Sequence, residues 1–205
     1  MLKVLIACEE SQTECVAFRH MKCEAYSADL QECSGGHPEW HFTGDCRLLF
    51  HPGTYTTQAG TRVDVDKWDL IIAHPPCTYL TRVCPYNTPD RIEKGFEAAA
   101  FFFEMLNAPA HYICVENPVP KKRFKLPPPD FACNPYDYGS PWRKKTLYWL
   151  RNLPPLMYGC SCPPGKSWVH CTRGSKKRSK SFPVIAQAMA EQWVPYILDD
   201  LARHK

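Results

Sequence analysis

The stretch that decides the fold is WDLIIAHPPCTYL, residues 68–80, in which a short apolar run stops at a histidine, two prolines and a cysteine. An apolar run rich in β-branched residues that stops at proline is typical of a buried strand, because proline cannot continue the hydrogen-bonded ladder. The run at 68–73 is therefore predicted to be a strand. Stretches of the same form at 3–7, 23–27 and 112–115 predict three more.

Apolar residues at helical spacing lie between and after these strands. They predict helices over 12–21, 91–107 and 182–201. The second helix is expected to bury Phe96, Ala99, Ala100, Phe103 and Leu106, and the last Ile185, Met189, Trp193 and Ile197. Alternating strands and helices predict an α/β fold with a doubly wound, mostly parallel sheet. Ligands of such sheets bind outside the carboxyl ends of the strands, so the residues that follow each strand are the candidates for function.

Three segments, 51–67, 118–135 and 153–180, are polar or rich in proline and glycine and are expected to be long loops. A chain of 205 residues with 44% hydrophobic residues suits one domain, so 1–205 is interpreted as a single domain. Its apolar runs are too short to span a bilayer, and the amino-terminal stretch does not resemble a signal peptide. We therefore expect a soluble, cytoplasmic protein.

The twelve cysteines are scattered through strand-like stretches, which favours free thiols over a disulfide framework. Cys160, Cys162, His170 and Cys171 are zinc-type ligands close together in sequence. The usual Cys-x2-Cys spacing is absent and the adjacent His170 and Cys171 would strain a tetrahedral site, so no metal is expected. The net charge of +4 permits nucleic-acid binding without requiring it, and basic clusters at 121–125, 143–145 and 176–180 could hold phosphate.

Two strand ends carry residues suited to catalysis. Cys77 follows one strand at the mouth of the predicted sheet, where a thiol is placed to act as a nucleophile. The next strand, HYICVENP, ends in Glu116 and Asn117, and a partly desolvated Glu116 could give a proton to a ring nitrogen. Alternatively, Cys77 is one more inert structural cysteine, and Glu116 caps the following loop or pairs with a lysine.

Several blocks, in the right order over about residues 3–150, resemble the cytosine-C5 DNA methyltransferases. The Pro-Pro-Cys of 75–77 looks like the catalytic loop of that family, and Glu116-Asn117 looks like its Glu-Asn-Val motif with Pro118 in place of valine. AYSAD, ending in Asp29, and Gly44-Asp45 resemble its cofactor motifs, and DYGSP at 137–141 resembles the segment before its basic strand. The resemblance implies a Rossmann-like class I methyltransferase fold, with 1–205 as the catalytic domain.

The resemblance also implies roles for individual residues. Cys77 would be the covalent nucleophile and Glu116 its acidic partner, acting at the cytosine ring. S-adenosyl-L-methionine would be held by Cys8, Glu9, Glu10, Ser11, Asp29, Asp45 and Pro75. The substrate would be held by Pro76, Asn117, Arg143 and Lys144, with the base-gripping role of the family's first arginine passing to either Arg143 or Lys144.

Two departures from the family pattern qualify this interpretation. The glycine-rich cofactor loop is replaced by ACEESQ at 7–12, which has no glycine to let a ligand approach the backbone closely. Residues 151–180 are a short variable region in place of a target-recognition domain, as in compact proteins of phage type. We therefore expect a free cytidine nucleotide as substrate. The alternatives are a DNA methyltransferase of low sequence specificity, or one that needs a partner, and a catalytically silent paralogue that binds nucleotide or nucleic acid.

Overall fold

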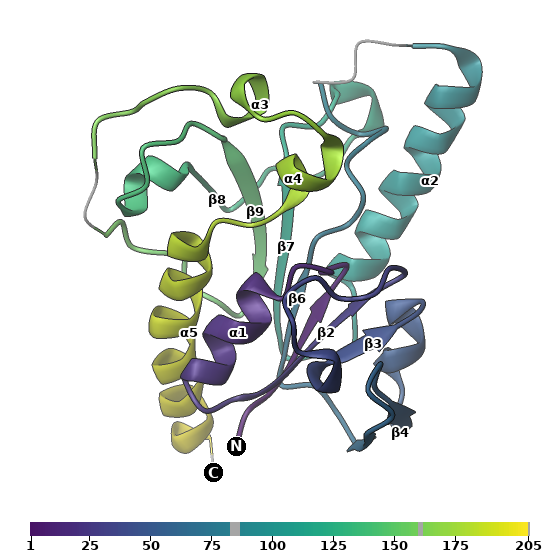
Figure 1. Cartoon of the computed structure of the whole chain (residues 1–205), viewed down its shortest axis with the longest axis vertical. Coiled ribbons are helices and arrows are strands. Elements are labelled where there is room, and N and C mark those ends of the chain that lie inside the picture. The colour runs from purple at the N-terminus through teal and green to yellow at the C-terminus, as the bar shows by residue number, and fades with distance from the viewer. Residues whose placement is uncertain (83–86, 160–161, 205) are drawn as a thin grey trace.

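The computed structural model describes residues 1–82, 87–159 and 162–204 and is built around one large sheet (Figure 1). Its seven strands lie in the order β3-β2-β1-β6-β7-β9-β8. They are β1 (Lys3–Ala7), β2 (Glu24–Asp29), β3 (His41–Thr43), β6 (Leu70–Ala73), β7 (Tyr112–Pro118), β8 (Phe131–Cys133) and β9 (Thr146–Arg151). The first five of these pair in parallel, and β9 runs antiparallel between β7 and β8. The expected Rossmann-like α/β fold with a mostly parallel, doubly wound sheet is confirmed.

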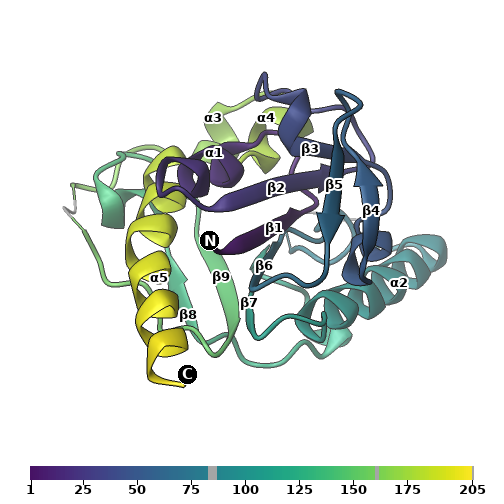
Figure 2. The same cartoon turned by 90° about the horizontal axis from the view of Figure 1, so that it is seen from below.

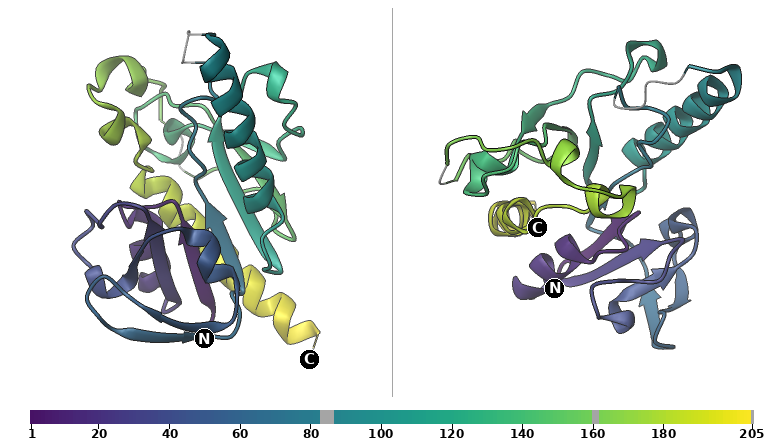
Figure 3. Two further views of the ribbon diagram at one scale, coloured as in Figure 1. Left: turned by 90° about the vertical axis from the view of Figure 1, so that its right-hand side faces the viewer. Right: turned by 45° about the horizontal axis from the view of Figure 1, so that its top comes forward.

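Helices cover both faces of this sheet (Figure 2). The α-helices are α1 (Thr13–His20), α2 (Pro89–Leu106), α3 (Trp168–Cys171), α4 (Ser175–Ser179) and α5 (Pro183–Arg203). Short 3-10 turns are η1 (Pro38–Trp40), η2 (Cys46–Phe50), η3 (Lys122–Phe124) and η4 (Pro135–Tyr138). α1 and α5 pack on one face, whereas α2 and the hairpin of β4 (Gly53–Thr56) and β5 (Arg62–Val65) pack on the other. The short α3 and α4 lie at the end of the molecule opposite both termini (Figure 3).

Alternate residues of each central strand enter opposite halves of the core. Val4 and Ile6 of β1 pack toward α1 and α5, whereas Leu5 packs toward α2, and all three side chains are buried. A strand buried on both faces requires an unbroken apolar run, which is the pattern that identified these segments in the sequence. The stripe expected on the last helix is also buried, with Trp193 fully enclosed in the α1 and α5 half.

The buried face of α2 differs from the expected one. The expected face included Phe96 and Phe103, but these side chains are 54% and 38% exposed. The helix instead buries Gly95, Ala99, Phe102 and Met105. Gly95 is required there because a Cβ at this position would lie 2.2 Å from a ring carbon of Phe124. Three consecutive phenylalanines, 101–103, give the sequence two nearly equivalent apolar frames, and packing against η3 and β9 selects between them.

Segments expected to be long loops contain regular structure. The 51–67 segment holds the β4–β5 hairpin, in which Val63 and Val65 alternate with exposed residues. The 118–135 segment contains η3 and β8, and 153–180 contains α3 and α4. These elements are three to five residues long, too short to give a clear periodic signal. No helix in the described residues is long and apolar enough to cross a membrane.

Candidate active site

The ends of β6 and β7 bring the two candidate catalytic residues together. Ala73 of β6 pairs with Val115 of β7, so the chain after Ala73 emerges beside Glu116. The His74 amide donates a 2.9 Å hydrogen bond to the Ala7 carbonyl, which extends the ladder one residue toward β1. The two prolines then end the ladder and lead the chain to Cys77. This is the edge where the strand order reverses between β1 and β6, the usual ligand site of a doubly wound sheet.

Asn117 fixes the loop that carries Cys77. Its side-chain amide donates a 2.9 Å hydrogen bond to the Pro75 carbonyl, and Asn117 itself is 1% exposed. The Cys77 carbonyl accepts hydrogen bonds from the amides of Leu80 and Thr81, which start a turn immediately after the thiol. Pro75 is buried and Pro76 exposed. Asn117, expected to contact substrate, is seen here holding the loop that carries Cys77 in position.

The Cys77 thiol is protonated at rest. Burial raises its pKa, and the negative charge of Glu116 raises it further, whereas Lys144 acts in the opposite direction. Because the thiolate is the reactive form of cysteine, any reaction at Cys77 would require this proton to leave. Among the described residues near Cys77, Lys144 carries the positive charge that favours loss of the thiol proton.

His74 lies between two carboxyl groups. Its Nδ1 is 3.4 Å from Glu116 Oε2, and its Nε2 is 3.4 Å from Glu14 Oε1 on α1. Burial disfavours the imidazolium, but the charges of Glu14 and Glu116 outweigh burial and raise the pKa of His74. Glu14 is 1% exposed, and although burial favours its neutral form, the charge of His74 is the main effect that holds its pKa below the ordinary value. An imidazolium between two carboxylates is the expected resting state.

Glu9 completes this cluster behind Glu14. Its carboxyl oxygens accept hydrogen bonds from the amides of Glu14, at 2.7 Å, and Cys15, at 3.3 Å, so it caps the first turn of α1. Burial and the nearby Glu14 charge raise the pKa of Glu9 well above the ordinary value. Glu9 is therefore neutral and Glu14 ionised. Glu9, expected to contact the cofactor, is seen here supporting Glu14.

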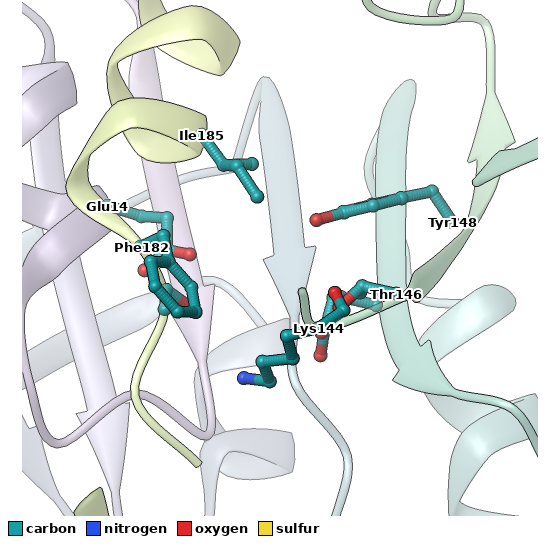
Figure 4. Close-up of a pocket in the computed structure, with 8 residues that line it drawn as sticks. Glu14, Lys144, Thr146, Tyr148, Phe182 and Ile185 are labelled. Carbon is teal, nitrogen blue, oxygen red and sulfur yellow. The ribbon is translucent and has the colours of Figure 1, made fainter. Parts of the chain in front are cut away.

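A small cavity opens beside this cluster (Figure 4). Lys144, Thr146 and Tyr148 come from β9 and the residues before it, and face Glu14, Phe182 and Ile185. Glu116 and Ser181 complete the lining. Of the two residues between which the sequence left the base-gripping role open, Lys144 lines the cavity, whereas Arg143 is exposed.

The segment before α5 covers this cavity. Lys144 Nζ donates to the Lys180 carbonyl at 3.3 Å and lies 5.8 Å from the centre of the Phe182 ring. Trp168 packs edge-on against Phe182, with ring centres 5.1 Å apart, and its amide bonds to the Arg143 carbonyl. Residues 180–182 therefore lie against Lys144 at this cavity.

The loop after β1 turns sharply without glycine. Cys8 and Gln12 adopt left-handed backbone angles, with φ of 61° and 59°. The Gln12 side chain exchanges hydrogen bonds with the backbone of His37, and Gly35 lies so close that a Cβ there would be 2.5 Å from Gln12 Cβ. The loop thus turns without a glycine of its own, and the close packing beside it uses a glycine from a distant segment.

Glu10 lies in this loop with an unsatisfied carboxylate. Both of its oxygens are buried and lack a hydrogen-bond partner among the described residues, and its nearest charge is Lys180 Nζ at 3.7 Å. A buried carboxylate without donors calls for a further partner. The positively charged amino group of S-adenosyl-L-methionine suits this position. Ser11 bonds to Thr13 through its hydroxyl, at 3.0 Å, and Cys8 Sγ lies 4.0 Å from Cys46 Sγ.

Asp29 and Asp45 lie at the ends of β2 and β3, as the sequence predicts. Asp29 is the last residue of β2, and its carbonyl accepts the Gly44 amide at 2.8 Å, which joins the two strand ends. Its carboxylate accepts one backbone amide, from Gln31, at 2.9 Å. Asp45 is held through both oxygens by Arg47, which lowers the pKa of Asp45 and also pairs with Glu104.

The soft ligands singled out in the sequence do not form a described metal site. Cys160 lies outside the described residues, and no group of three or more potential ligands occurs within them. Every cysteine that the structure describes is a free thiol. Among them, Cys171 is exposed and Cys77 is partly buried.

Sequence reasoning assigned no role to Glu14 or His74. His74 was part of the fold-deciding stretch, and its place between a strand and two prolines was the available signal. Glu14 follows Glu9 by five residues at the start of a helix, a spacing that carries no recognisable pattern. Lys180 appeared in the sequence only as one member of a basic cluster.

No family model and no curated protein matches the chain in sequence. Among solved structures it is similar to a protein described as a DNA modification methyltransferase from an E. coli prophage, with 12% identity and a TM-score of 0.45, over 73% of this chain and 46% of that one. It is also similar to the Entamoeba histolytica methyltransferase EhMeth, with 14% identity and a TM-score of 0.42, over 82% and 57% of the two chains.

A third similar structure is the S. pombe Dnmt2 methyltransferase, with 15% identity and a TM-score of 0.41, over 76% of this chain and 50% of that one. The chain thus spans about half the length of the proteins it matches. At these identities and TM-scores the likeness carries no argument about activity. The fold is established by the strand order itself, which is that of the expected class I methyltransferase sheet.

Proposed function

We propose that this protein is an S-adenosyl-L-methionine-dependent methyltransferase that acts on C5 of cytosine, with Cys77 as the covalent nucleophile and Glu116 as its acid. The single observation that carries this proposal is the pairing of β6 with β7, which sets the Cys77 loop beside Glu116 at the switch point of the sheet. Asn117 ties the two strand ends together through Pro75. A thiol and a carboxyl at one such edge can act on opposite positions of one ring.

The chemistry follows from the weakness of cytosine C5 as a nucleophile. Cys77 loses its proton to water and its sulfur adds to C6, while Glu116 delivers a proton to N3, so that N3 accepts the electron density released by the addition. C5 then has enamine character. S-adenosyl-L-methionine supplies an electrophilic methyl group when bound. Loss of the C5 proton to water finally expels Cys77 as a thiolate, which takes up a proton again, and restores the aromatic ring.

The loop after β1 and the ends of β2 and β3 are the proposed cofactor site. The unsatisfied carboxylate of Glu10 would take the amino group, and Asp29 would accept the ribose hydroxyls. Asp45, assigned to the adenine, would have to leave Arg47 to do so. Cys8, Ser11 and Pro75 line the same edge and would contribute contacts through backbone and shape.

Asp29→Ala is expected to weaken S-adenosyl-L-methionine binding by about tenfold to a hundredfold, the usual effect of losing a hydrogen bond to a charged group. Isothermal titration calorimetry measures this directly. Glu32→Ala, an exposed carboxylate three residues further on, is the matched control and should bind as the wild type does. Equal affinity in Asp29→Ala and the control would remove Asp29 from the cofactor site.

A free cytidine nucleotide is the proposed substrate. Only residues 151–180 occupy the place of a recognition domain, and a free nucleotide avoids the cost of taking a base out of a duplex stack. Lys144 lines the cavity and Lys145 is exposed beside it, so both are placed to meet a phosphate. DNA, read without sequence specificity or with a partner, is the second candidate, favoured by the same basic residues.

A silent paralogue that binds nucleotide or nucleic acid remains the non-enzymatic alternative. The observation that favours it is the covered cavity, in which Phe182 and Lys180 lie against Lys144. An enzyme of this design must open that cover in every catalytic cycle. A binding protein need not.

The test is transfer of labelled methyl from S-adenosyl-L-methionine to dCMP, dCTP, single-stranded DNA and duplex DNA, followed by mass analysis of the nucleosides. We expect 5-methylcytosine, with dCMP or dCTP as the best acceptor. A DNA sample as the best acceptor would support the second candidate. Cofactor binding without label transfer to any sample would favour the silent paralogue.

A further inference from the structure

A continuous line of buried titratable groups runs from α1 to the candidate catalytic acid. Glu14 contacts His74 Nε2, and His74 Nδ1 contacts Glu116, each at 3.4 Å. The three side chains are 1%, 13% and 16% exposed, respectively. They come from a helix, a strand end and a neighbouring strand, so their meeting depends on the tertiary fold rather than on local sequence.

The charges around His74 come from every element packed against it. Glu14 faces it from α1, with neutral Glu9 behind, and Glu116 faces it from β7. Lys144, just before β9, is the cation on the same side and opposes a proton on the ring. Cys77, three residues along the same loop, feels the charge of Glu116. Two carboxylates and one lysine lie near His74, so the net charge around the ring favours its imidazolium form.

A purely structural role explains this arrangement poorly. A buried ion pair contributes little net stability because of the cost of desolvating its charges, and here one imidazole meets two carboxyl groups. The carboxyl on one side is the group that the proposed reaction needs as a proton donor, and the cavity where a ring would lie is bordered by Glu14 and Glu116 alike.

We propose that Glu14 and His74 form a proton relay that supplies Glu116 with the proton it gives to the cytosine ring. The proposal rests on the function proposed above and deepens it. Glu14 and His74 do not touch the reacting atoms and are positioning residues that act through Glu116. Glu9, whose raised pKa keeps it neutral, lies behind Glu14 and accepts the Glu14 amide at 2.7 Å.

The protons balance in each step. As sulfur adds to C6, the proton on His74 Nδ1 passes to the Glu116 carboxylate, and Glu116 gives a proton to N3 and is a carboxylate again. His74 is then neutral, and its remaining proton, on Nε2, faces the Glu14 carboxylate. When Cys77 leaves, N3 returns its proton to Glu116, Glu116 passes it back to His74 Nδ1, and the relay returns to its first state. No oxidant, reductant or further co-reactant is needed.

The relay gives His74→Gln a characteristic pH dependence. Below the pKa of His74 the wild type holds the relay proton, so its kcat should exceed that of His74→Gln by about tenfold to a hundredfold, near the lower end of general acid catalysis. Because the pKa of His74 is raised in the folded protein, this advantage persists above the ordinary histidine range. It disappears as pH rises through that pKa. A structural contact would instead give a ratio that does not change with pH.

The experiment combines kcat profiles with NMR titration of histidine in 15N-labelled protein. The His74 signal is identified by its loss in His74→Gln, and His51→Gln, at an exposed site, is the matched control. Glu14→Gln should lower the His74 pKa by about one to two units, since it removes an adjacent charge. The loss of the wild-type advantage should move to lower pH by the same amount. Glu14→Gln also serves as the second variant where His74→Gln does not fold.

Each result is decisive for one proposal or the other. Methyl transfer with a ratio that follows the NMR titration, and that shifts in Glu14→Gln, supports the relay. Methyl transfer with a constant ratio, or a His74 that is neutral at pH 6, overturns the relay and leaves the proposed function standing. Absence of methyl transfer by the wild type overturns both proposals.

Discussion

Replacing Cys77 with alanine is expected to lower kcat for cytosine methylation by at least about ten-thousandfold, because removal of a covalent nucleophile leaves only binding effects. The loop is held by the backbone of Pro75 and by Asn117, so the fold should persist without the thiol. S-adenosyl-L-methionine binding should remain close to that of the wild type. Single-turnover assays with labelled cofactor, alongside calorimetric binding, measure the two effects separately.

Cys171→Ala is the matched control for this variant. Cys171 is an exposed thiol on α3, so its loss should leave kcat unchanged. Comparable turnover in Cys77→Ala and wild type would eliminate the covalent mechanism, and a parallel loss in Cys171→Ala would point to a general sensitivity of the protein to cysteine removal.

Glu116→Gln is expected to lower kcat by about a thousandfold while changing the reactivity of Cys77 in the opposite direction. Glutamine cannot transfer a proton to N3, which removes the general acid. Because the charge of Glu116 raises the pKa of Cys77, its removal lowers that pKa and increases the thiolate fraction at neutral pH. Iodoacetamide should therefore label Cys77 faster in the variant than in the wild type.

The two readouts distinguish catalysis from structure. Glu97→Gln removes an exposed carboxylate of α2 and should leave both turnover and labelling unchanged. Slower turnover of Glu116→Gln with slower labelling of Cys77 would indicate a displaced loop. Unchanged turnover would exclude Glu116 as the acid.

The strands and the two residues at their ends could be predicted because each depends on local sequence. A buried parallel strand needs an unbroken apolar run, and proline marks its end, so Cys77 and Glu116 follow from position alone. Adjacency of β6 and β7 is the commonest arrangement of successive strands of such a sheet. The last helix could be predicted equally well, because its apolar residues form one unambiguous stripe: Ile185, Met189, Trp193 and Ile197.

The features that the sequence did not predict depend on contacts between distant segments. The buried face of α2 depends on Phe124 and Trp149, which are distant in sequence and decide between two apolar frames. The tight β1 turn depends on Gly35, far along the chain. Glu14 and His74 form a pair only because the first turn of α1 lies beside the residue that follows β6, a tertiary contact that no spacing records.

Sequence alone also could not decide whether Arg143 or Lys144 lines the cavity, because this too depends on tertiary structure. Both are basic and adjacent in sequence, but successive side chains of an extended segment point in opposite directions. The register of β9 against β7, with Thr146 opposite Pro118, decides that Lys144 lines the cavity. A shift of one residue in that register would have reversed the assignment.

The most direct test of the account is mass spectrometry of the protein incubated with S-adenosyl-L-methionine and 5-fluoro-dCMP, or single-stranded DNA containing 5-fluorocytosine. Fluorine at C5 cannot leave as a proton does, so the methylated ring should stay bonded to the nucleophile. The account predicts a cofactor-dependent adduct on the peptide that contains Cys77, absent from Cys77→Ala. Methylation of ordinary cytosine without any adduct on Cys77 would contradict it.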